Sequence, residues 1–249
     1  MPSSLLGADT LVPVTESLVA MVTKHLKTTP VFWGRYFKRP SFEQDYQPAS
    51  ENAVFNNHHI RLLPIARQTN RVAGTASDGA ADAILNVDAF VKSLELENLA
   101  SIGGELLMFL DVEGTSERNP NLSVDYWIGW SGALVAHSRR VSGGRFTMVP
   151  GVYCRQNQNP TWEAIVRADA LGFPCVGAWI FRSRTGACTK PVPSWDAPFN
   201  TPAVKLPCPI MAWQFAIDCL FEGGVDFDMV NPDPSIESAL LNRLIVPPA

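Results

Sequence analysis

Eight short apolar runs are spread along the chain, and most of them are followed by a longer amphipathic stretch. They span residues 5–10, 31–37, 60–68, 105–113, 147–156, 175–183, 210–218 and 224–231. This alternation of strands and helices is typical of βαβ units and predicts a parallel sheet. At 249 residues, the economical closed form is an α/β fold with one domain over residues 1–249, a (β/α)8 TIM-like barrel that can be irregular.

An open, doubly wound sheet is the alternative arrangement of the same elements. No predicted strand is followed by a G-x-G-x-x-G turn, and the chain contains no Walker-type phosphate loop. The sequence therefore gives no sign of a dinucleotide or nucleotide cofactor, and we expect no cofactor.

Helices are expected between the strands. Apolar residues recur at helical spacing, or end signals occur, in residues 14–26, 79–98, 123–138, 160–172 and 235–245. Ser50 is a candidate cap for a short helix over residues 51–59. The segment 183–209 contains six prolines and is expected to be a long loop, either a functional lid or an irregular crossover.

Composition and charge restrict the partners. Hydrophobic residues make up 46% of the chain and the formal net charge is −4, without a cluster of Lys and Arg, so we expect no nucleic-acid partner. The start of the chain lacks a basic segment followed by an apolar core, and no apolar run reaches the ~18–20 residues of a membrane span. We expect a soluble protein, cytoplasmic or exported by a leaderless route. Its oligomeric state stays open.

The five cysteines are scattered and form no C-x-x-C pair, so neither a zinc site nor a disulfide framework is predicted. Reduced, mostly buried thiols are the expectation. Cys188 and Cys208 flank a loop and are the one pair considered for a bridge.

The fourth apolar run ends in two acids, Asp111 and Glu113. Residues i and i+2 of a strand face the same way, so both carboxylates are expected inside the barrel at the carboxyl end of the strand, where barrel active sites lie. Like charges this close raise at least one pKa, and a protonated acid beside an ionised one is what glycoside hydrolysis requires. Alternatively the pair caps the strand or holds an arginine such as Arg67 or Arg155.

Further acids end the first and last runs. Asp9 ends the first run, and Asp226 and Asp228 alternate with apolar residues in the last one. We expect these side chains to join Asp111 and Glu113 at the mouth. Such a ring of acids could also bind a divalent metal, although no histidine is an obvious further ligand.

Aromatic residues near the strand ends are candidates for stacking on sugar rings. They are Trp33, Tyr36, Tyr153, Trp179 and Trp213, of which two or three are expected at the mouth and the others in the core. Gln214 and Asp228 are candidate polar contacts that fix the sugar hydroxyls.

Several motifs resemble the family 25 glycoside hydrolases, which are lysozyme-type muramidases, and resemble still more closely the uncharacterised relatives of that family. They are "GAD" in the first run, "FLDVEG" in the fourth, "PGVYC" in the fifth and "WQFAID" followed by "GVDFDMVN" at the end. The resemblance implies a barrel that cleaves the β-1,4 bond between N-acetylmuramic acid and N-acetylglucosamine in bacterial cell-wall peptidoglycan. It implies Glu113 as general acid, Asp111 as its partner carboxylate, and Asp9 and Asp226 as supporting acids.

The sequence departs from these lysozymes in two places. "TLVPV" follows Asp9 where the family has D-[VI]-S, and "LLPIARQTN" replaces a stretch rich in glycine and tyrosine. Two other functions therefore stay open: a catalytically degenerate barrel that binds a glycan or a protein, and a metal-dependent hydrolase.

Overall fold

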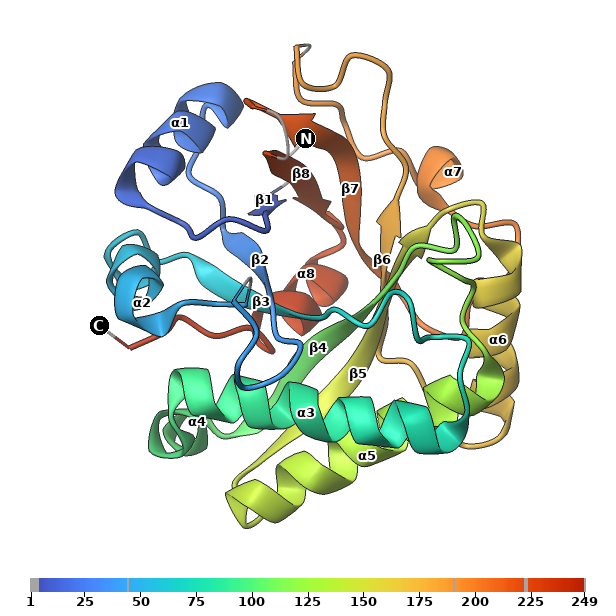
Figure 1. Cartoon of the computed structure of the whole chain (residues 1–249). Coiled ribbons are helices and arrows are strands. Elements are labelled where there is room, and N and C mark those ends of the chain that lie inside the picture. The colour runs from blue at the N-terminus through green and yellow to red at the C-terminus, as the bar shows by residue number, and fades with distance from the viewer. Residues whose placement is uncertain (1–4, 44, 190, 222–223, 249) are drawn as a thin grey trace.

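Eight strands close into a barrel in the computed structural model, which describes residues 5–43, 45–189, 191–221 and 224–248 (Figure 1). The strands follow one another around the barrel in chain order. They are β1 (Leu6–Asp9), β2 (Phe32–Tyr36), β3 (Arg61–Ala66), β4 (Gly104–Val112), β5 (Phe146–Arg155), β6 (Gly177–Phe181), β7 (Ile210–Cys219) and β8 (Val225–Val230). All eight strands predicted from the sequence are present.

The last strand breaks the predicted parallel arrangement. Strands β1 to β7 pair in parallel, whereas β8 is antiparallel to both β7 and β1. The connection between Cys219 and Val225 is too short for a crossover helix, so the chain returns directly beside β7. As a result β8 begins at the end of the barrel where the other strands finish.

Helices pack around the outside of the barrel, with α3 and α5 side by side along one flank (Figure 1). The helices are α1 (Glu16–Leu26), α2 (Pro48–Asn57), α3 (Ala76–Leu94), α4 (Leu96–Ile102), α5 (Val124–Ser142), α6 (Asn159–Ala170), α7 (Ala197–Asn200) and α8 (Pro234–Leu241).

The predicted bounds of two helices are corrected by the structure. The helix expected over 79–98 begins earlier, because Thr75 and Asp78 form a capping box, and it ends at Leu94, because Glu95 has a φ of 62° and interrupts it before α4. Ser50 does not cap α2, because the helix starts at Pro48, whose fixed φ suits the first helical position.

The core has two layers separated by the barrel wall. Inside the barrel, side chains such as Phe32, Phe109 and Trp179 pack against one another. Between the wall and the helices lies a larger layer that includes Trp33 and Trp213. Gly7 in β1 faces inward, and a Cβ there would lie 2.2 Å from the ring of Phe32, so the inner layer depends on its missing side chain.

The C-terminal segment closes the barrel end opposite the acids. Leu240 and Leu244 join the inner core, and the backbone N–H of Leu107 donates to the carbonyl of Arg243 at 3.0 Å. Glu105, the second residue of β4, is exposed at this end and pairs with Arg243 at 2.7 Å.

The proline-rich segment 183–209 runs beside β6 and β7 and carries α7, a single helical turn (Figure 1). The bridge considered between Cys188 and Cys208 is wrong, because Cys188 is disulfide-bonded to Cys219 at the end of β7. The expectation of reduced thiols holds for Cys154, Cys175 and Cys208, which are free. No helix among the described residues is long and apolar enough to cross a bilayer.

Candidate functional site

A polar cavity of about 80 Å³ lies at the carboxyl end of the parallel strands. Its lining comes from all eight strands and from the residue just after β4. The lining residues are Asp9, Tyr36, Ile65, Asp111, Glu113, Tyr153, Trp179, Gln214 and Asp226. Four carboxylates from three separate parts of the chain thus meet at the place where α/β barrels carry their active sites.

The two acids of β4 lie at different depths. Asp111 is the second-last residue of the strand and is only 6% exposed, whereas Glu113 follows the strand and is partly exposed. The side-chain amide of Asn119 donates to Oε2 of Glu113 at 2.8 Å. Glu113 is therefore held at the rim, where it can reach a bound molecule, and Asp111 lies below it.

Asp9 and Asp226 are brought together by the register of β1 with β8, in which they are direct partners. We expected Asp226 near the end of a parallel strand; it lies instead near the start of an antiparallel one, which places it at the same mouth. Its Oδ1 accepts the backbone N–H of Asp218 at 2.8 Å, so the end of β7 also orients it.

Gln214 links these two acids. Its amide nitrogen donates to Oδ2 of Asp9 at 2.8 Å and to Oδ2 of Asp226 at 3.0 Å, and its oxygen accepts the hydroxyl of Tyr153 at 2.6 Å. Gln214 was predicted to contact substrate. Its polar atoms are instead already bonded to protein groups, so it positions carboxylates.

Asp228 does not line the cavity, although it was predicted to contact substrate. It pairs with Gly7, one layer deeper in the barrel, and is fully buried. Its Oδ1 accepts the indole N–H of Trp179 at 2.9 Å. Burial and the nearby charges of Asp9 and Asp226 raise the pKa of Asp228 well above its ordinary value.

Three acids that line the cavity also hold protons more tightly than usual, because their pKa values are raised. Burial, reinforced by the charge of Glu113, raises the pKa of Asp111 to about 7. Burial raises the pKa of Asp9 to about 7, although the hydrogen bond from Gln214 opposes the shift. Burial and the charge of Asp9 raise the pKa of Asp226 to about 8. Burial is thus the larger cause, and the like charge expected from the sequence is the smaller one.

Three of the five candidate aromatic residues line the cavity: Tyr36, Tyr153 and Trp179. Trp33 and Trp213 do not, and their prediction as sugar-stacking residues was wrong. Each lies at an odd position of a strand whose even positions face inward, and both indoles are buried in the layer between barrel and helices.

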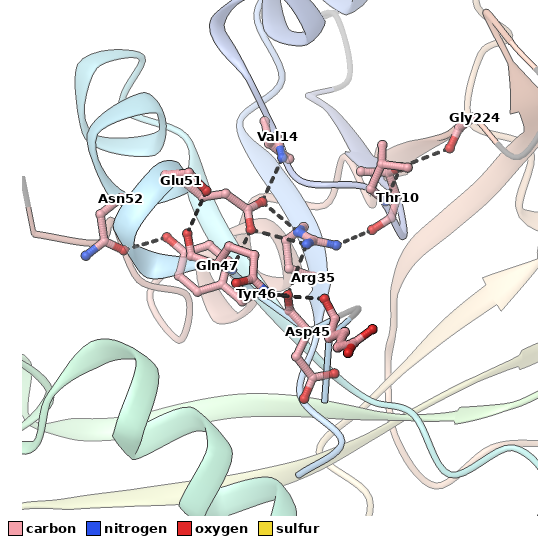
Figure 2. A network of polar contacts seen from close by, with 12 residues as sticks. Thr10, Val14, Arg35, Asp45, Tyr46, Gln47, Glu51, Asn52 and Gly224 are labelled. Atoms are coloured by element: carbon pink, nitrogen blue, oxygen red, sulfur yellow. Dashed lines mark hydrogen bonds and ion pairs between the residues drawn. The ribbon is translucent and has the colours of Figure 1, made fainter. Parts of the chain in front are cut away.

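A buried polar network behind the cavity was missed by the sequence analysis (Figure 2). Arg35 of β2 and Glu51 of α2 form an ion pair at 2.7 Å, and both side chains are 0% exposed. Arg35 also donates to the carbonyl of Thr10 at 2.7 Å, and the hydroxyl of Thr10 donates to the carbonyl of Gly224 at 2.9 Å. A charged residue in the middle of the apolar strand "VFWGRYF" was the available signal.

This network reaches the cavity through the backbone. Thr10 directly follows Asp9, and Gly224 lies two residues before Asp226. Glu51 further accepts the backbone N–H groups of Val14 and Gln47. The ion pair therefore ties α2 and the loop after β1 to both strands that carry these two acids.

Metal-ligating clusters are absent from the part of the chain that the structure describes: no three side chains of His, Cys, Asp or Glu lie in positions to hold one ion.

Comparison with known proteins gives a likeness of fold. No family model matches the sequence, and no curated protein matches it. An uncharacterised protein from B. stearothermophilus has a TM-score of 0.69 at 19% identity, over 97% of this chain and 100% of that one.

Two enzymes share the fold at lower similarity. The catalytic domain of endolysin Ply40, from bacteriophage P40 of Listeria monocytogenes, has a TM-score of 0.56 at 15% identity, over 98% of this chain and 99% of that one. A muramidase from Acremonium alcalophilum has a TM-score of 0.51 at 15% identity, over 96% of this chain and 99% of that one. The chain thus has the barrel fold found in lysozyme-like enzymes.

Proposed function

We propose that this protein is a single-domain glycoside hydrolase that cleaves peptidoglycan or a related glycan by carboxylate acid catalysis, without a cofactor. The observation that carries the proposal is the meeting of Asp9, Asp111, Glu113 and Asp226 in one cavity at the catalytic end of the barrel. An endolysin and a muramidase with the same fold support peptidoglycan as the substrate class.

Glu113 is the proposed general acid. It is partly exposed at the rim, and the amide of Asn119 holds one of its oxygens, which leaves the other able to carry a proton toward a glycosidic oxygen. Protonation of that oxygen lets the bond to the sugar ring break while positive charge develops on the ring.

Asp111 is the proposed partner carboxylate. When ionised, it lies below the ring and can stabilise the positive charge or orient the substrate's own N-acetyl group. Its pKa of about 7 means that a substantial fraction of Asp111 is ionised near neutral pH. Asp9 and Asp226, linked by Gln214, complete the carboxyl floor of the site.

The test is the release of new sugar ends from purified peptidoglycan. The proposal predicts soluble fragments with N-acetylmuramic acid at the reducing end, identified by mass spectrometry after reduction. Chitin, which lacks the lactyl group, serves as the comparison substrate. Absence of new reducing ends from several cell walls of different chemistry would contradict the proposal.

A barrel that binds a glycan without cleaving it is the second candidate. The cavity of about 80 Å³ favours it, because pockets that enclose a small molecule usually measure roughly 300–1,000 Å³. This candidate predicts saturable binding of chitotetraose or of peptidoglycan fragments with no product, and binding that is unchanged in Glu113→Gln.

A further inference from the structure

A second, larger depression lies on the same rim, outside the carboxylate cavity. It has a volume of about 530 Å³ and forms where the proline-rich segment leaves β6. Arg182, Ser183, Arg184 and Phe199 are among its lining residues. We call it the arginine groove.

The arginine groove borders the strand that organises the acids. The backbone N–H of Arg182 donates to the carbonyl of Gln214 at 3.1 Å, and that of Arg184 donates to the carbonyl of Phe215 at 2.9 Å. The chain therefore continues along β7 after β6 ends, and both arginines lie at the carboxyl-end rim. A polymer that enters the acid cavity over Gln214 passes this rim.

Both guanidinium groups are held in place by the same ring. The Cζ atoms of Arg182 and Arg184 lie 3.8 and 4.3 Å from the centroid of Phe199. Arg182 also donates to the carbonyl of Phe199 at 2.8 Å. Stacked guanidinium groups lose less freedom on binding, so two such groups are prepared to bind an oxyanion through paired hydrogen bonds.

The positive charge in the arginine groove is only partly balanced. Arg184 pairs with Asp196 at 2.6 Å, whereas Arg182 has no carboxylate partner among the described residues. The Nε of Arg184 is buried and has no hydrogen-bond partner in the described part of the chain. A buried donor without an acceptor is costly, so the hydrogen bonds of this guanidinium are incompletely satisfied within the described residues.

We propose that the arginine groove binds an oxyanion group, a carboxylate or a phosphate, carried by the glycan that occupies the acid cavity. The inference rests on the proposed function for the identity of that glycan. Its physical basis is charge: the two arginines carry positive charge beside the acid cavity, and that charge attracts an oxyanion on the polymer.

The test measures binding to Glu113→Gln protein by titration calorimetry with two uncleaved tetrasaccharides. One alternates N-acetylglucosamine and N-acetylmuramic acid and carries carboxylates; the other is neutral chitotetraose. Replacing Arg182 and Arg184 with Gln should weaken the binding of the anionic probe roughly tenfold or more, because charge-assisted hydrogen bonds contribute on that order. The affinity for chitotetraose should stay within about twofold of its value in the parent protein. Arg139→Gln, on the distant helix α5, should change neither.

Further measurements identify the oxyanion and control for misfolding of the variants. Competition by inorganic phosphate would assign phosphate as an accepted ligand, and arginine-dependent binding without such competition would assign the carboxylate. If the double variant unfolds, Arg182→Gln alone gives the readout, since its exposed side chain donates only to a backbone carbonyl. Arg182→Lys, which keeps the charge but not the planar group, should restore binding only in part.

The outcome separates this inference from the proposed function. Equal binding of the anionic probe by the parent protein and the arginine variants overturns the inference, even where wild type cleaves peptidoglycan. Arginine-dependent binding by a wild-type protein that cleaves no cell wall upholds the inference and rejects hydrolysis.

Discussion

Asp111 and Glu113 are two residues apart, yet their surroundings give them different properties. Asp111 lies inside the barrel wall with a raised pKa, and Glu113 lies past the end of the strand with one oxygen bound to Asn119. Strand alternation explains why both face the cavity, and the end of β4 explains why only one of them is exposed.

Gln214 offers a test of positioning at the residue scale. Its N–H groups favour the ionised form of Asp9, so Gln214→Met should raise the pKa of Asp9 further and move the acidic limb of the kcat/KM profile to higher pH. We also expect kcat/KM at pH 6 to fall at least about tenfold, because well-placed general acid–base groups contribute about 10²–10⁴-fold to the rate.

The control for this variant is Gln156→Met, whose amide bonds the carbonyl of Thr201 at the exposed surface and should leave the profile unchanged. If kcat/KM of Gln214→Met falls equally at every pH and the acidic limb of the profile is not displaced, Gln214 does not act through Asp9.

At the scale of elements, the sequence predicted the eight strands and the meeting of their acids, because periodicity and strand order depend on local patterns. The direction of β8 was not predicted, because "WQFAIDCLFEGGVDFDMV" reads as two strands without stating how they pair. Asp226 nevertheless reached the mouth, because a strand that starts there brings its first acid to the place where the others end.

The same local patterns could not give the depth or facing of particular side chains. Asp228 shares a face with Asp226 but lies one layer deeper, and Trp213 faces outward because Gln214 faces inward. The partner of Cys188 depends on how segment 183–209 folds back over β7, which spacing alone does not specify.

The Arg35–Glu51 pair provides a stability test at the element scale. Glu51→Gln leaves the buried guanidinium without its counterion, and breaking such a pair typically costs about 3–5 kcal/mol of unfolding free energy. Urea denaturation monitored by circular dichroism measures the change. Activity should fall as well, because Arg35 holds the backbone next to Asp9.

Glu97→Gln is the matched control. It removes the ion pair with Arg145, in which the side chain of Arg145 is 44% exposed and that of Glu97 is 80% exposed. Exposed pairs of this kind contribute about 0–1 kcal/mol to the free energy of unfolding. Similar losses in the two variants would contradict a special role for the buried network.

For the whole molecule, the raised carboxyl pKa values predict how stability depends on pH. Between about pH 4 and pH 8, Asp9, Asp111 and Asp226 bind more protons in the folded state than in the unfolded chain. The free energy of unfolding therefore falls as pH rises through this window, and the contribution is complete below the unfolded pKa of each acid. The total is on the order of several kcal/mol, since one pKa unit corresponds to about 1.4 kcal/mol.

Thermal unfolding between pH 4.5 and pH 8.5 checks this prediction. Asp111→Asn removes one titrating group and should therefore make the free energy of unfolding fall less steeply with pH. A wild-type unfolding free energy that stays constant or rises over this range would mean that the cavity acids are not held protonated by burial.

The central claim is that Glu113 donates a proton to a glycosidic bond, and the most direct measurement compares Glu113→Gln with wild type on purified peptidoglycan. We predict that release of reducing ends falls at least about 100-fold, with the melting temperature unchanged. Glu117→Gln, in the exposed part of the same loop, should retain wild-type activity. Equal release by Glu113→Gln and wild type, or no release by wild type, would contradict the account.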